Sequence, residues 1–226
     1  ELRRGDASLN ARFSGKVSVL FGDLIFVKAL AAAHDLDDQR VIPRIYHAVG
    51  RMVDGEIAES LTGYDCDEET YFRIVGDKTG SLFAVAGEVG ILLSGGDDAA
   101  QRTAAQFGDT IGTLFQIIDD ILDVTGATEA TGKPRLMDLA AGRMTLPVIH
   151  AFHGLSSEEI DEMMTTIDDG HDRVLDRIKA CGSVDYAYKT AQRILDDAQQ
   201  MLVSFAGAHA AEDFDEFFDM MLSRAG

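Results

Sequence analysis

The sequence predicts an all-α protein. Its 226 residues include 3 prolines and no tryptophan. Its long segments repeat apolar residues at spacings of three and four, which is the period of a helix and not of a strand. A chain of this length can bury a sizeable core. Because no repeat, low-complexity tract or proline-rich linker divides it, the simplest organisation is a single helical domain over residues 1–226.

The first half of the chain predicts four long helices. Acidic residues at the start of the third favour a helix entry, Gly95-Gly96 ends it, and Asp97-Asp98 opens the fourth. The expected helices cover residues 9–34, 38–61, 65–93 and 97–123.

The second half predicts shorter helices. Ser156 and Glu159 have the spacing of a capping box, which marks a helix start. The expected helices lie near 144–152, after Ser156, after Gly170, and over 183–205 and 210–224.

Gly80 lies in the middle of the third predicted helix, directly after Lys78-Thr79. A glycine there costs about 1 kcal/mol relative to alanine. We expect a kink at Gly80, which frees backbone carbonyls that can face a positive centre.

The fourth helix ends in the run Phe115-Gln116-Ile117-Ile118-Asp119-Asp120-Ile121-Leu122-Asp123. At about 3.6 residues per turn, Asp119 and Asp123 lie on one helix face and Asp120 about 100° away. Carboxylates among packed apolar side chains are costly unless they are paired. The pattern predicts a divalent cation site at Asp119, Asp120 and Asp123, and Mg²⁺ is the cation that takes few carboxylates together with substrate phosphates.

The segment after this run carries positive charge. Gly132-Lys133-Pro134 is followed by Asp138-Leu139 and by Gly142-Arg143 through Leu146-Pro147. A cation site bordered by basic side chains suits a ligand more negative than a carboxylate, and a diphosphate fits.

Composition excludes several classes of partner. A formal net charge of -19 disfavours nucleic acid and anionic membrane surfaces. The most hydrophobic stretch, 17–33, is interrupted by Asp23 and Lys28, so no integral membrane segment is expected. Cys66 and Cys181 are too few for a disulfide framework, and we expect a cytoplasmic protein.

Together these motifs resemble the trans-polyprenyl diphosphate synthases, of octaprenyl or geranylgeranyl type, from residue 1 to about residue 150. Arg3-Arg4-Gly5 is similar to the arginine pair after the family's first aspartate-rich motif. Lys78-Thr79-Gly80 and the run 115–123 resemble the allylic diphosphate segment and the second aspartate-rich motif. The chain starts at Glu1, just after the place of the first DDxxD motif, and we interpret it as lacking that N-terminal part.

The resemblance implies a helical bundle of the isoprenoid synthase type and a prenyltransferase. Such an enzyme joins isopentenyl diphosphate to an allylic prenyl diphosphate after Mg²⁺-assisted ionisation. It further implies a homodimer, and we expect this homodimer to be cytoplasmic. The implied catalytic residues are Lys78, Thr79, Gln116, Asp119 and Asp120, and the implied substrate-binding residues are Arg3, Arg4, Lys78, Thr79, Gln116 and Lys133.

Two other interpretations stay open at this point. The chain is a non-catalytic partner subunit if its preceding residues lack a DDxxD motif. A terpene cyclase shares the helix and metal arrangement, although the arginine pair and the Lys133 segment favour the synthase. The mostly small residues at 29–33 suit either a cavity for a medium or long product, which we expect, or tight helix packing.

Overall fold

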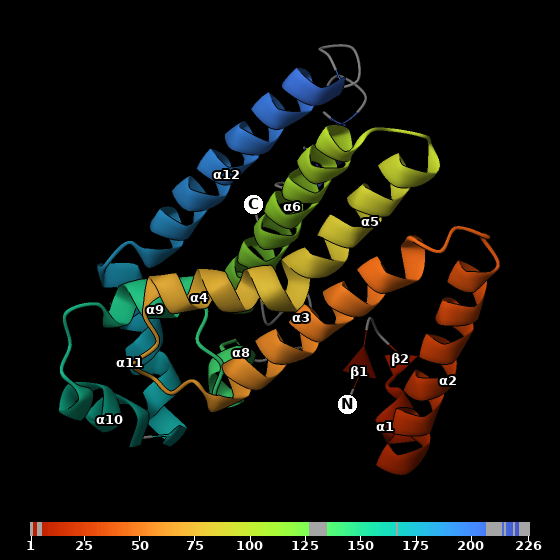
Figure 1. Ribbon diagram of the computed structural model, residues 1–226. Coiled ribbons are helices and arrows are strands. Elements are labelled where there is room, and N and C mark those ends of the chain that lie inside the picture. Colours follow the sequence, from red (N-terminus) through yellow and green to blue (C-terminus); the bar gives the residue numbers. More distant parts are fainter. Residues whose placement is uncertain are drawn as a thin grey trace. The chain divides into compact units, whose positions relative to one another are not determined.

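The computed structural model describes residues 2–3, 6–126, 135–165, 167–206, 214, 216–218 and 220–221. Its chain forms two compact units, Glu1–His47 and Ala48–Gly226 (Figure 1). Apart from one pair of two-residue strands, every described element is a helix, which confirms the all-α prediction. The single domain expected from the sequence stays a prediction.

The first unit opens with two short antiparallel strands, β1 (Leu2–Arg3) and β2 (Asp6–Ala7). The predicted helix over 9–34 is two helices, α1 (Leu9–Arg12) and α2 (Gly15–His34). The single-helix prediction is wrong because Phe13 has an extended backbone and Ser14 begins a new helix, its side chain accepting a hydrogen bond from Val17 N. α3 (Val41–Leu61) then crosses the division between the units.

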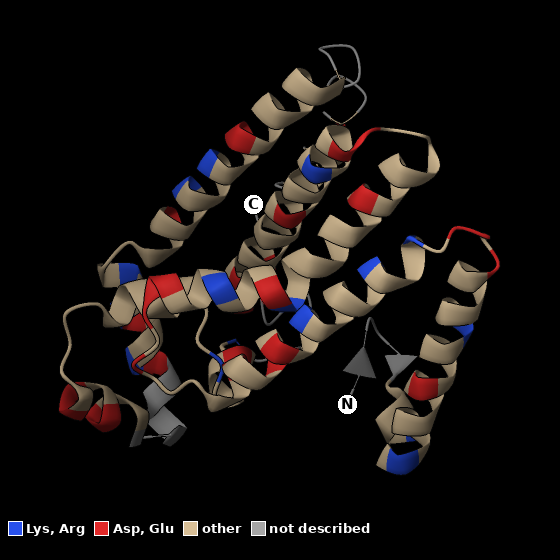
Figure 2. Ribbon diagram, in the orientation of Figure 1, with Lys and Arg blue, Asp and Glu red and all other residues tan. Residues whose placement is uncertain are grey.

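α2 is mostly apolar and contains no buried residue. Figure 2 marks few charged residues on it. By length and composition alone, this 20-residue helix is sufficient to cross a membrane, since an 18-residue window of it has a mean hydropathy of 1.6. Asp23 and Lys28 therefore do not remove this helix from the candidates for a membrane span, contrary to the expectation from the sequence.

In the second unit the predicted third helix is divided into three parts. α4 (Glu68–Val75) is capped by the Asp67 side chain, η1 (Gly76–Gly80) is one π-helical turn, and α5 (Ser81–Leu93) follows in a different direction from α4 (Figure 1). The predicted irregularity at Gly80 is therefore present, as a π-helical segment, a form that occurs mostly as single turns at functional sites.

The longest helix is α6 (Asp98–Thr125), with Asp97 as its cap. It packs against α5 on one side and α12 on another, and Figure 1 shows these three helices side by side. The acidic run lies in its last turns, as predicted.

The rest of the unit consists mainly of short helices. The predicted capping box is confirmed, since Ser156 N donates to Glu159 and Glu159 N donates to Ser156 Oγ. The predicted helix over 210–224 lies mostly outside the described residues, and its described residues are helical. The short helix at Met137 was not expected, and the helices are α8 (Met137–Ala140), α9 (Leu146–Phe152), α10 (Ser157–Thr165), α11 (Ile167–Ala180) and α12 (Ser183–Ala206).

Two clusters of buried side chains form the core of this unit. The larger one gathers α4, α6, α9 and α12 around Leu114, Ile117 and Ile121, all fully buried. The smaller one lies among α8, α9, α10 and α11. The apolar face of α6 is thus held by packing on several sides, which fixes where its carboxylates point.

Candidate active site

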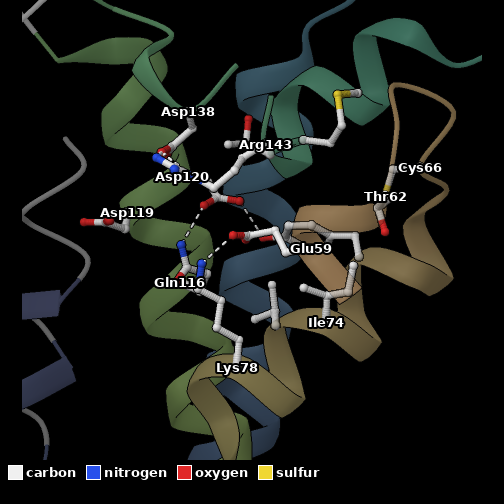
Figure 3. Close-up of a pocket in the computed structure, with 14 residues that line it drawn as sticks. Glu59, Thr62, Cys66, Ile74, Lys78, Gln116, Asp119, Asp120, Asp138 and Arg143 are labelled. Carbon is white, nitrogen blue, oxygen red and sulfur yellow. Dashed lines mark hydrogen bonds and ion pairs between the residues drawn. The ribbon is translucent and has the colours of Figure 1, made fainter. Parts of the chain in front are cut away.

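A cavity of about 230 Å³, open to solvent, lies in the second unit. Residues of α3, α4, η1 and α6 line it together with the segment from Asp138 to Thr145. Figure 3 shows Lys78, Gln116, Asp120 and Arg143 around it. The structure therefore brings the two sequence motifs and the basic segment to one place.

Asp120 is 2% exposed. Its Oδ2 accepts hydrogen bonds from Tyr71 Oη at 2.7 Å and from Leu146 N at 3.2 Å, and its Oδ1 accepts one from Gln116 Nε2 at 3.0 Å. Both carboxylate oxygens are thus occupied by the protein. Of the predicted metal ligands, Asp120 is the one that is fully buried, with three hydrogen-bond donors from the protein.

Asp119 and Asp123 have different surroundings from Asp120. Asp119 is exposed, lines the cavity, and points away from Asp120 and Gln116 (Figure 3). Asp123 is half-buried and accepts backbone hydrogen bonds from Met137 N at 3.0 Å and Asp138 N at 3.3 Å. Asp123 therefore ties the start of α8 to α6.

Two of the carboxyl groups in this region have raised pKa values, because burial is not balanced by enough nearby positive charge. Burial raises the pKa of Asp120 to about 7, against hydrogen bonds that lower it. Burial and the nearby Asp138 carboxylate raise the pKa of Asp123 to about 6. Carboxyl groups that resist ionisation here are groups that a bound cation stabilises.

The donor set fits a cation that takes few protein ligands. Among the described residues, no three His, Cys, Asp or Glu side chains converge as a ready-made metal cluster. Mg²⁺ commonly uses one or two carboxylates and fills its octahedron with water and substrate phosphates. Asp119, exposed at the cavity, and Asp123 fit that role, whereas a three-carboxylate site that includes Asp120 does not fit.

Lys78 projects from η1 into the cavity and is held by two carboxylates of α3. Its Nζ lies 2.5 Å from Glu59 Oε2 and 3.1 Å from Glu56 Oε2. Partial burial lowers the pKa of Lys78, but the hydrogen bonds to Glu59 and Glu56 outweigh this effect and the net shift is upward. The ammonium group is therefore fully charged near neutral pH.

Gly55 permits this contact between α3 and η1. A Cβ atom built on Gly55 would lie 2.5 Å from the backbone nitrogen of Lys78, a distance that no side chain tolerates. Glycine thus lets α3 approach the π-helical turn closely enough for Glu56 and Glu59 to reach Lys78.

Thr79 and Gln116 are joined across the two elements. Thr79 Oγ1 lies 3.2 Å from Gln116 Oε1 and donates to it. Because Gln116 Nε2 bonds Asp120, a continuous chain of hydrogen bonds runs from Thr79 of η1 to Tyr71 of α4. The sequence predicts Thr79 and Gln116 as neighbours in the site, and the structure brings them together.

The far wall of the cavity contributes Arg143, which forms an ion pair with Asp138. Next to it, Thr145 is 3% exposed. Its Oγ1 has no hydrogen-bond partner in the part of the chain that the structure describes. A buried hydroxyl without a partner in a cavity wall is available to a ligand or an ordered water.

Three predicted substrate-binding residues cannot be placed. Arg4 and Lys133 lie outside the described residues, and Arg3 belongs to β1 with its side chain outside the described part. Their roles stay predictions.

Sequence reasoning missed Glu59 and Tyr71 as site residues. A signal existed for both, since Glu59 follows Glu56 by one turn of α3 and Tyr71 precedes Lys78 by two turns, so each pair shares a helix face. The sequence does not indicate that Tyr71 bonds Asp120, because the two residues are 49 positions apart.

Residues 1–182 match the family model described as Polyprenyl synthetase. The chain belongs to this family. The octaprenyl diphosphate synthase of Escherichia coli (strain K12) is 34% identical over 205 residues, which are 88% of this chain and 64% of that protein. The chain therefore spans less than two thirds of that relative.

Solved structures of the polyprenyl synthetase type agree with the fold. A decaprenyl diphosphate synthase from Rhodobacter capsulatus has a TM-score of 0.88 at 25% identity, over 100% of this chain and 72% of that one. A polyprenyl synthase from Caulobacter crescentus CB15, complexed with calcium and isoprenyl diphosphate, has a TM-score of 0.88 at 27% identity, over 100% and 71%. The isoprenoid synthase fold expected from the sequence is confirmed.

Proposed function

We propose that the protein condenses isopentenyl diphosphate with an allylic prenyl diphosphate and releases a longer all-trans polyprenyl diphosphate. The observation that carries this proposal is the juxtaposition of Lys78, on a π-helical turn, with the acidic run of α6 across one cavity. Family membership supports it, since the relatives named above are synthases of such products. The cyclase and partner-subunit alternatives are not favoured by these relatives.

Asp119 and Asp123 are the residues that we propose to hold Mg²⁺. When bound there, the ion supplies electrostatic stabilisation to the departing diphosphate. The related Caulobacter crescentus protein was crystallised with calcium and isoprenyl diphosphate, which supports a divalent cation and a diphosphate as ligands of this protein.

Lys78 binds the allylic diphosphate in this proposal. Its ammonium group is now paired with Glu59 and Glu56, so an incoming diphosphate must replace at least one carboxylate. A diphosphate carries more charge than a carboxylate, and it therefore competes well for the same cation. Arg3, Arg4 and Lys133 would complete the two diphosphate sites.

Thr79 and Gln116 act on the positive charge that remains when the diphosphate leaves. Their oxygen atoms lie within one hydrogen-bonded pair beside the cavity. Oxygen dipoles fixed in a partly desolvated site stabilise a cation without reorganising. The double bond of isopentenyl diphosphate then attacks this cation, and the final proton passes to the released diphosphate.

The exposed apolar surface of α2 supports a homodimer. Val19, Leu20 and Val27 are each more than half exposed, and a second copy of the chain is the occupant that we propose for this surface. We also propose a cytoplasmic location, consistent with two cysteines that are free of any disulfide, and a medium or long product, as the names of the relatives suggest.

The test is incorporation of labelled isopentenyl diphosphate by the longest native form of the protein, with allylic primers of several lengths. Elongated products that require Mg²⁺ and disappear with a chelator are expected. Absence of incorporation with every primer, by a folded protein, would contradict the proposed function. Chromatography of the products measures their length in the same experiment.

A further inference from the structure

A chain of hydrogen bonds links three elements through the interior of the site. Tyr71 of α4 bonds Asp120 of α6, Asp120 bonds Gln116 one turn earlier, and Gln116 bonds Thr79 of η1. Figure 3 shows Gln116 and Asp120 directed toward one another. Each link of such a chain needs one donor and one acceptor. The groups at its ends therefore determine which atom donates at each link.

The buried end fixes the orientation of the Gln116 amide. Asp120 acts as an acceptor in this chain, since Tyr71 Oη and Leu146 N both donate to it, and a carboxylate that accepts from all its partners has no hydrogen to donate. Asp120 Oδ2 is already used by Tyr71 Oη and Leu146 N, so Oδ1 faces Gln116. Gln116 must present its Nε2 donor there, because its carbonyl oxygen would meet another acceptor at 3.0 Å.

The orientation of Gln116 in turn fixes Thr79. With Nε2 directed to Asp120, the oxygen Oε1 faces Thr79. The threonine hydroxyl has a single hydrogen, which it donates to Oε1. Thr79 therefore has only lone pairs to offer to any other group.

We propose that Asp120 and Tyr71 are positioning residues that set the polarity of Gln116 and Thr79, so that the Thr79 hydroxyl presents lone pairs and not its hydrogen to the reacting centre. This inference rests on the proposed function, in which that centre becomes positive. A hydroxyl oxygen stabilises a cation with its lone pairs, whereas a hydroxyl hydrogen directed at the cation destabilises it. Asp120 thus acts through Gln116 and is not a ligand of the metal.

The substitution Asp120→Asn tests this polarity without removing volume. Asparagine keeps one oxygen for Tyr71 and Leu146 and turns its amide nitrogen to Gln116. The Gln116 amide then reverses, and Thr79 must accept and direct its hydrogen elsewhere. We expect kcat to fall about a hundredfold, as for the loss of one preorganised dipole, with both KM values within about twofold.

A second substitution is expected to restore the polarity. In the double variant Asp120→Asn with Gln116→Glu, one oxygen of the introduced glutamate accepts from the introduced asparagine amide, and its other oxygen accepts from Thr79. The net charge equals that of the natural chain. The single variant Gln116→Glu instead places two carboxylates against each other. We expect both single variants to be slow and the double variant to regain at least about tenfold in kcat.

Controls separate positioning from structure and from metal binding. Asp98→Asn makes the same change on an exposed residue at the start of α6, and its kcat should not change. If Asp120 binds the metal, the double variant stays as slow as Asp120→Asn and its residual rate requires more Mg²⁺ than that of the natural protein. Equal losses in the single and double variants, or full activity of Asp120→Asn, would overturn the inference.

Neutron diffraction of deuterated crystals of the natural protein provides a readout that is independent of activity. The inference predicts deuterium on Thr79 Oγ1 directed at Gln116 Oε1, and deuterium on Gln116 Nε2 directed at Asp120. The reverse arrangement would overturn it. Lack of isopentenyl diphosphate incorporation by the natural protein would contradict only the proposed function, and the neutron maps would still decide the polarity.

Discussion

At the scale of single residues, the three aspartates of one motif have three different environments. Asp120 is buried and fully hydrogen-bonded, Asp123 holds the start of α8, and Asp119 is exposed at the cavity. Helical spacing predicts which face each carboxylate shares. It does not predict partners such as Tyr71 or Leu146, because these come from distant segments through packing. The sequence therefore predicts the motif and its chemistry but not the separate role of Asp120.

Glu59→Gln should free Lys78 for the substrate. The amide keeps the shape of the side chain but removes a carboxylate at 2.5 Å from the ammonium nitrogen. Partly exposed ion pairs are worth up to about 1 kcal/mol, so the KM for the allylic diphosphate should fall about two- to fivefold while kcat changes little. Glu69→Gln, at an exposed position of α4, is the matched control. A rise in KM would show that Glu59 itself serves the substrate.

The stability of the metal-free protein should fall as the pH rises. Burial raises the pKa of Asp120 from 3.8 to about 7 and that of Asp123 to about 6. The folded state therefore binds more protons than the unfolded chain between about pH 4 and pH 7, and it loses stability across that window. Thermal unfolding of the natural protein and of Asp120→Asn would measure this, with a weaker pH dependence expected in the variant. Equal dependence in both would contradict the assignment to Asp120.

At the scale of elements, close packing of α5 against α6 positions the two halves of the site. The sequence predicts an irregularity near Gly80 because glycine is unfavourable within a helix. It does not predict that the irregularity is a π-helical turn, since that form depends on neighbours such as α3 and α6. Likewise, the break between α1 and α2 at Phe13 comes from the helix cap at Ser14. The apolar spacing does not indicate this cap, because the spacing continues on both sides of the break.

Gly108→Ala should destabilise the protein by about 1 to 3 kcal/mol. A Cβ at this position would lie 2.3 Å from the carbonyl oxygen of Phe83 on α5, and two backbones must separate to admit it. Gly90→Ala, on an exposed position of α5 where a Cβ meets nothing within 4 Å, is the control and should be neutral or stabilising by up to about 1 kcal/mol. Urea unfolding of both variants measures the difference. Similar stability for the two would contradict the close packing.

At the scale of the molecule, the acidic chain places few of its charged residues on α2 (Figure 2). The fold class, most helices and the location of the site could be predicted, because helical period, caps and the acidic motif are local signals. The two compact units and the cavity could not, since they depend on contacts between segments far apart in the chain. The exposure of α2 is likewise visible only in the structure.

Val19→Asp should weaken self-association. Val19 is 65% exposed in α2, and a charge there would be buried without a partner in a dimer. Light scattering after size exclusion should show a dimer for the natural protein and a monomer for the variant. Val203→Asp, an exposed apolar position of α12, is the control. A natural protein that is monomeric, or that floats with lipid vesicles through α2, would contradict the proposed homodimer.

The central claim is that the allylic diphosphate ionises in this site before a new bond forms. The most direct measurement compares single-turnover rates for a natural allylic primer and for the same primer carrying fluorine next to its allylic centre. Fluorine withdraws electrons and destabilises the cation but scarcely changes the size of the primer, so we predict a rate lower by several orders of magnitude with a similar KM. Equal rates for the two primers would contradict ionisation and, with it, the roles given to Asp119, Lys78 and Thr79.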